Sequence, residues 1–122
     1  LHVSRSGGEI LDARTPGRFS GTEKDRYPGT RSGHIPGSHN LYWGNLLNHE
    51  TREFLPKKLI EKQFRASGVD VTKPTILSCG SGLTACILAL ALDQLGHTGW
   101  KVYDGSWDEW GRDHTLPIET HS

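Results

Sequence analysis

The apolar residues of this chain lie in short blocks that polar, glycine-rich segments separate. Four blocks contain branched or aromatic side chains between turn-forming residues, a pattern that predicts strands. The predicted strands are Glu9–Ala13, Leu41–Trp43, Thr75–Leu77 and Lys101–Asp104. The polar segment from Arg18 to Gly37 is predicted to be a long loop, and loops of that length are usually functional or disordered.

Two longer segments have the pattern of helices. Between Pro56 and Ala66, the residues Leu59, Ile60 and Phe64 fall on one helical face, and lysines lie mostly on the other. The segment Leu83–Leu95 is apolar almost all round, so we expect other elements to cover it on more than one face. Strands that alternate with helices in this way predict an α/β domain with a largely parallel sheet.

A glycine-rich loop joins the third predicted strand to the apolar helix. It consists of Ser78, Cys79, Gly80, Ser81, Gly82, Leu83 and Thr84. This order places the Cys79 sulfur at the carboxyl end of a strand, beside helix N–H groups that have no intrahelical partner. Gly80 and Gly82 allow the loop to curl, so that several N–H groups can point at one anion. Such a cradle favours the thiolate, which is the nucleophile. The alternative is a buried structural cysteine in a turn.

Composition limits the possible classes of protein. The 122 residues are 34% hydrophobic and 23% charged, which is typical of one soluble globular domain. The 14 basic and 14 acidic residues balance, and without a basic stripe we do not expect nucleic-acid binding. No apolar run is long enough to predict a membrane span. We expect a linker or frayed terminus at residues 1–8 and one domain over residues 9–122.

The two cysteines have different expected roles. Seven helical steps would place Cys79 and Cys86 roughly 10 Å apart, whereas a disulfide needs Cα atoms within about 7 Å. We therefore expect a reactive thiol at Cys79 and a core thiol at Cys86, in a reducing compartment such as the cytoplasm. The sequence contains no methionine, so we expect it to be a fragment or an excised domain.

Several separated motifs together resemble those of the rhodanese superfamily. The motifs are Leu11–Arg14, Gly17–Phe19, Gly33–Asn40, Cys79–Thr84, Tyr103–Trp107 and Glu109–Trp110. Within the superfamily the loop is similar to that of the 3-mercaptopyruvate sulfurtransferase branch, with Leu83 where that branch has valine. The resemblance covers roughly Glu9 to Glu119. It implies a C-terminal catalytic domain with the rhodanese-like α/β fold, a five-stranded, mainly parallel sheet flanked by helices.

The resemblance also implies a reaction. Cys79 would take sulfane sulfur from 3-mercaptopyruvate, or less well from thiosulfate, and pass it from a persulfide to a thiol or cyanide. Ser81 would orient the donor or move its proton, and the rest of the loop would hold the persulfide. The loop residues implied in that binding are Gly80, Gly82, Leu83 and Thr84. No cofactor is implied, and the seven histidines show no metal-ligand spacing.

Two arginines are candidates for binding the donor. In the mercaptopyruvate branch, arginines corresponding to Arg18 and Arg26 would grip the donor's carboxylate and carbonyl, which suits a guanidinium fork. The segment before Arg26 is one residue shorter than in the family, so Arg31 is an alternative. Both positions could instead be solvated surface arginines.

Other polar and aromatic residues are expected to have structural roles. We expect His34 and His39 to hold a turn by hydrogen bonds, and Asp12 to buttress the turn after its strand. Trp107 and Trp110, in a short helix or turn, are expected to pack in the core or against another domain.

Two functions are alternatives to sulfur transfer by an enzyme. A phosphatase or arsenate reductase would need an arginine at the end of the cysteine loop, where this chain has Ala85. That alternative is rejected. A non-catalytic or persulfide-relay interaction module stays open. In the resembled family, a histidine and an aspartate of a preceding, inactive rhodanese-like domain would form a relay with the residue at Ser81, and we expect that domain to be absent from this chain.

Overall fold

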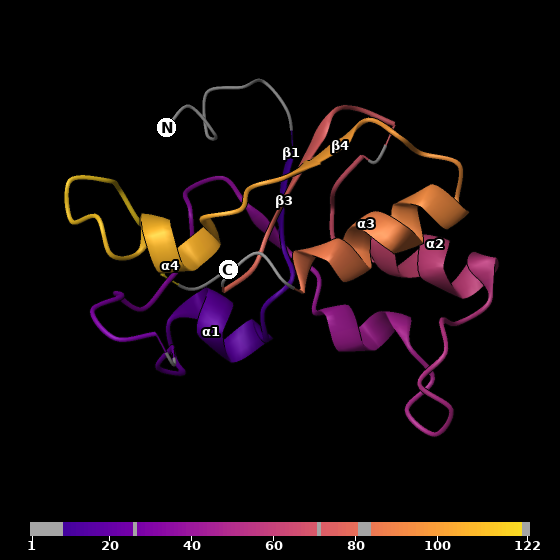
Figure 1. Cartoon of the computed structure of the whole chain (residues 1–122), viewed down its shortest axis with the longest axis horizontal. Coiled ribbons are helices and arrows are strands. Elements are labelled where there is room, and N and C mark those ends of the chain that lie inside the picture. The colour runs from indigo at the N-terminus through magenta and orange to yellow at the C-terminus, as the bar shows by residue number, and fades with distance from the viewer. Residues whose placement is uncertain (1–8, 26, 71, 81–83, 121–122) are drawn as a thin grey trace.

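The sheet at the centre of the protein is parallel. The computed structural model describes residues 9–25, 27–70, 72–80 and 84–120, so the expected linker at 1–8 lies outside them. The strands are β1 (Glu9–Asp12), β2 (His39–Asn40), β3 (Thr75–Ser78) and β4 (Trp100–Val102). Their order is β2-β1-β3-β4, and every pairing is parallel (Figure 1). The predicted α/β fold is confirmed, with four strands in the described residues.

Helices cover both faces of this sheet. They are α1 (Pro16–Ser20), the 3-10 helix η2 (Trp43–Leu46), α2 (Lys57–Ala66), α3 (Ala85–Gln94) and α4 (Ser106–Trp110). Successive strand residues point to opposite faces. Leu11 and Leu77 therefore pack in the core under α2 and α3, whereas Ile10 and Ile76 pack with the tryptophans of α4 on the other face (Figure 1). No described helix is long and apolar enough to cross a membrane.

Two local predictions were wrong. Leu41–Trp43 is not a strand, because the pairing with β1 ends at Asn40 and the chain then turns into η2. The amides of Leu41 and Trp43 still donate to the carbonyls of Asp12 and Ala13. The loop predicted from Arg18 begins instead as α1, whose first turn is capped by the Thr15 hydroxyl, 3.3 Å from the Arg18 nitrogen.

The predicted helices at Pro56–Ala66 and Leu83–Leu95 are present as α2 and α3, but their apolar faces differ from expectation. Ile60 and Phe64 are buried, whereas Leu59 is 46% exposed. On α3, Leu90 is 57% exposed and Cys86 is also exposed, so the prediction of a core thiol at Cys86 was wrong. The reason is that the sheet, η2 and α2 cover the side of α3 that carries Leu88 and Leu92, whereas no described element covers the side that carries Cys86 and Leu90.

Candidate sulfur-transfer site

The sulfur of Cys79 lies at the end of the sheet where parallel α/β proteins usually bind their ligands. Cys79 follows β3 at its carboxyl end and is 1% exposed. The backbone N–H of Ala85, the first residue of α3, donates to the Cys79 Sγ at 3.3 Å. An amide contact of the kind that the sequence predicts is thus present. Ser81, Gly82 and Leu83, whose amides were expected to contribute, lie outside the described residues.

The first turn of α4 fixes the backbone of the cysteine loop. The Cys79 N–H donates to the Ser106 Oγ at 3.0 Å, and the Ser106 hydroxyl donates onward to the Tyr103 carbonyl at 2.7 Å. The Trp107 and Asp108 N–H groups donate to the carbonyls of Cys79 and Gly80 at 2.9 and 2.7 Å. N–H groups that a helix leaves without intrahelical partners therefore bind the loop.

A tyrosine packs closely against the loop. A Cβ placed on Gly80 would lie 2.9 Å from the Tyr27 hydroxyl oxygen and 3.0 Å from its Cζ. Glycine is needed at this position because any larger residue would collide with the ring. The neighbouring candidate Arg26 lies outside the described residues.

A buried charge network lies behind the site. The Arg14 guanidinium binds Asp12 and Asp25, each at 2.9 Å, and donates to the Gly33 carbonyl at 2.7 Å. It also lies over the Trp107 ring, 4.7 Å from the centroid. Burial lowers the pKa of Arg14, but the attraction and hydrogen bonds of Asp12 and Asp25 outweigh it, so this pKa lies above its ordinary value. The network joins the end of β1, the Asp25 segment and α4.

Comparison with known proteins agrees with this geometry. The rhodanese-like domain family matches residues 2–113 of the sequence. The chain belongs to the rhodanese-like domain family.

Three similar proteins illustrate that membership. The mitochondrial thiosulfate/3-mercaptopyruvate sulfurtransferase 1 of Arabidopsis thaliana is 43% identical over 90% of this chain and 29% of its own length. The Tum1 protein of Saccharomyces cerevisiae superposes with a TM-score of 0.82 and 34% identity, over 99% of this chain and 42% of its own. A structure of EanB with a cysteine persulfide and ergothioneine superposes with a TM-score of 0.84 and 25% identity, over 93% of this chain and 28% of its own. The rhodanese-like domain thus spans about a third of these relatives.

Arg18 and the alternative candidate Arg31 have other described partners in this rhodanese-like domain. The Arg18 Nε lies 3.2 Å from the Glu23 carboxylate, and the Arg18 side chain is part-exposed. Arg31 is used structurally, because its guanidinium donates to four main-chain carbonyls. The acceptors are Trp110, Gly111, Asp113 and Leu116. Arg31 is therefore not placed to replace Arg26 as a donor-binding residue.

The structural roles predicted for other residues are mostly confirmed. His34 stacks on Phe19 at a centroid distance of 3.8 Å, and its Nδ1 lies 2.6 Å from the Phe19 carbonyl. Asp12 accepts the Arg14 N–H at 2.9 Å and so buttresses the turn after β1. Trp107 and Trp110 are buried in the core. His39 instead lies on the edge strand, with its Nε2 3.6 Å from the Glu9 carboxylate.

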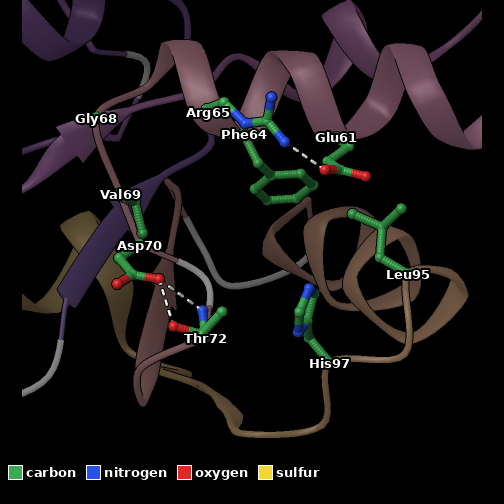
Figure 2. Close-up of a pocket in the computed structure, with 9 residues that line it drawn as sticks. All are labelled: Glu61, Phe64, Arg65, Gly68, Val69, Asp70, Thr72, Leu95 and His97. Carbon is green, nitrogen blue, oxygen red and sulfur yellow. Dashed lines mark hydrogen bonds and ion pairs between the residues drawn. The ribbon is translucent and has the colours of Figure 1, made fainter.

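A pocket of about 520 Å³ has no described residue of the cysteine loop in its lining. Figure 2 shows the side chains that line it. The pocket lies between the end of α2, the segment that leads into β3, and the end of α3. Its lining residues are Glu61, Phe64, Arg65, Gly68, Val69, Asp70, Thr72, Leu95 and His97. Because β3 runs away from this end toward Cys79, the pocket is at the amino end of the parallel strands.

Ser106→Ala is expected to destabilise the rhodanese-like domain by about 1–3 kcal/mol, because the buried Cys79 N–H would lose its acceptor. Urea unfolding followed by fluorescence measures this change. Ser38→Ala is the matched control, since the Ser38 hydroxyl also donates to a carbonyl three residues back, that of Ile35, but accepts no described amide. Equal losses in the two variants would contradict the role assigned to Ser106.

Proposed function

We propose that this domain is a sulfurtransferase that carries sulfur as a Cys79 persulfide. The observation that carries the proposal is the Cys79 sulfur at the carboxyl end of β3, with the Ala85 N–H directed at it. The Arabidopsis relative is named for the same reaction class, and the EanB structure holds a cysteine persulfide. An amide that stabilises a thiolate also stabilises the terminal sulfur anion or the leaving thiolate.

The proposed reaction has two steps. In the first, the Cys79 thiolate attacks the sulfur of 3-mercaptopyruvate, an S–S bond forms, and the C–S bond breaks. The electron pair of the broken C–S bond stays on the carbon, which gives the enolate of pyruvate. This enolate then takes up a proton and becomes pyruvate. With thiosulfate as donor, the leaving group is sulfite. In the second step, a thiolate or cyanide attacks the outer sulfur, and the Cys79 thiolate leaves.

The proposed roles of the other candidates follow from this reaction. Ser81 orients the donor or moves its proton, and the amides around Gly82, Leu83 and Thr84 hold the persulfide. Arg18 and Arg26 bind the donor's carboxylate and carbonyl. For Arg18, this binding requires the donor carboxylate to replace or join Glu23, its present partner. We favour 3-mercaptopyruvate over thiosulfate because the sequence of the cysteine loop contains no cationic side chain for a dianion.

We further propose that a preceding rhodanese-like domain works beside this one. The relatives are about two to three times as long as this chain, and the outer face of α3 exposes Leu90. A reducing compartment such as the cytoplasm suits a nucleophile that must stay a thiol between turnovers.

Incubation of the folded chain with each donor, followed by intact-mass and peptide analysis, tests the proposal. We expect Cys79 to gain the mass of one sulfur atom, and cyanide to remove it as thiocyanate. A folded sample that gains no sulfur from either donor would overturn the proposal. A protein thiol that accepts sulfur far faster than cyanide would instead assign the domain to persulfide relay.

A further inference from the structure

The side chain of Tyr27 packs against Gly80 of the cysteine loop from a distant segment of the chain. The hydroxyl end of its ring lies against Gly80, since the three atoms nearest to a Cβ placed there are Cε2, the hydroxyl oxygen and Cζ. Gly80 is the residue next to the nucleophile, and it is buried. The phenol therefore lies against the residue that directly follows the nucleophile in the cysteine loop.

The segment that carries Tyr27 is held firmly on both sides. Before it, the buried Asp25 carboxylate binds Arg14 at 2.9 Å. After it, the Thr30 hydroxyl donates to the Tyr27 carbonyl at 2.6 Å, and the Arg31 guanidinium binds the carbonyls that follow α4. A side chain anchored in this way keeps its position relative to the loop, which is a requirement for specificity.

The Tyr27 hydroxyl has no hydrogen-bond partner within the described part of the chain, although the side chain is half-buried. By contrast, a phenol and an indole near α4 have hydrogen-bond partners. Tyr103 donates to Glu109 at 2.6 Å, and Trp107 donates to the Arg31 carbonyl at 2.8 Å. A half-buried donor at the edge of the site is suited to receive a ligand's acceptor atom.

We propose that Tyr27 is a donor-binding residue, whose hydroxyl donates a hydrogen bond to an anionic oxygen of the sulfur donor. This assignment rests on the proposed sulfurtransferase function. The ligand class is a small oxyanion that carries a transferable sulfur, such as a mercapto-carboxylate or thiosulfate. A neutral phenol supplies one directed bond without adding charge, whereas a guanidinium supplies two bonds and a charge. The bond forms to the unreacted donor as well as in the transition state, so it contributes mainly to binding.

The test compares Tyr27→Phe with the wild-type chain in cyanide-coupled turnover of 3-mercaptopyruvate and of thiosulfate. Loss of a hydrogen bond to a charged group is expected to lower kcat/KM about ten- to a hundredfold, mainly through KM, with an unchanged unfolding midpoint. Tyr42→Phe is the matched control, because the Tyr42 ring packs against Gly44 and Trp43 and not against Gly80. Its kinetics should equal those of the wild type.

The possible outcomes distinguish a failure of the Tyr27 assignment from a failure of the proposed sulfurtransferase function. A wild-type chain that forms no persulfide overturns the proposed function and this assignment together. A wild-type chain that forms the persulfide, with Tyr27→Phe unchanged in KM or no different from Tyr42→Phe, overturns the assignment alone. A fall in kcat with KM unchanged would also overturn it, because a donor-binding bond acts on KM.

A second pair of variants tests the contact itself. Gly80→Ala should lower kcat/KM at least about tenfold because the new methyl group displaces the Tyr27 ring. In the double variant with Tyr27→Ala, the collision is absent, so the loss from Gly80→Ala should be much smaller than in the chain that keeps Tyr27. Additive effects would show that the two residues do not meet and would overturn the assignment.

Discussion

Replacing Cys79 by serine is expected to abolish sulfur transfer, with a loss of roughly a thousandfold or more in kcat/KM. A serine hydroxyl stays protonated near neutral pH and cannot form a persulfide. The fold should survive, since the smaller oxygen can still accept the Ala85 N–H that now binds the sulfur. We expect that the variant gains no mass on incubation with either donor. We also expect its circular dichroism spectrum to equal that of the wild type.

Cys86→Ser is the matched control for this experiment. Cys86 lies one residue beyond the sulfur-binding amide of Ala85, and it is exposed on α3. This variant should keep the full mass gain and turnover. Sulfur uptake by Cys79→Ser at the wild-type rate would show that another group is the nucleophile, and would contradict the assignment of Cys79.

Arg14→Met is expected to lower the free energy of unfolding by about 3–5 kcal/mol. Methionine keeps much of the apolar stem, but the buried carboxylates of Asp12 and Asp25 would lose their shared cation. The guanidinium would also no longer lie over Trp107. Urea unfolding at neutral pH measures this effect, and it should be large enough to shift the midpoint well outside error.

Arg18→Met is the matched control for Arg14→Met. Its ion pair with Glu23 is part-exposed, and pairs of that kind contribute about 0–1 kcal/mol. The two variants remove the same charge from arginines four residues apart. The difference between their free energies of unfolding therefore measures the effect of burying the ion pairs. Equal destabilisation would contradict the view that the Arg14 network holds the β1 turn to the Asp25 segment.

The parts of the fold that the sequence predicted are those encoded by neighbouring residues. The β3 strand, the glycine loop and α3 follow from one short apolar run, two glycines and a helical pattern. By contrast, Leu41–Trp43 has the composition of a strand, yet a strand exists only where a partner continues, and β1 ends opposite Asn40. The short α1 is not predicted because a threonine followed by proline and glycine is as typical of a turn as of the start of a helix.

The nucleophile could be predicted, but most of its surroundings could not. Cys79 is marked by residues adjacent to it in the chain. Ser106, Tyr27 and Arg31 reach the loop or α4 from segments far away in sequence, and no local pattern distinguishes them from surface residues. The exposure of Cys86 and Leu90 was missed for a related reason. An apolar helix pattern does not say how many layers will pack on the helix.

The bonds of Arg31 to the carbonyls of residues 110–116 have a consequence for where this domain can be shortened. The segment after α4 is therefore bound to the domain along its length, and a second attachment follows where Glu119 pairs with His34. Cutting the polypeptide behind Trp110 would free the stretch that presents Tyr27, although every residue of the cysteine loop would still be present.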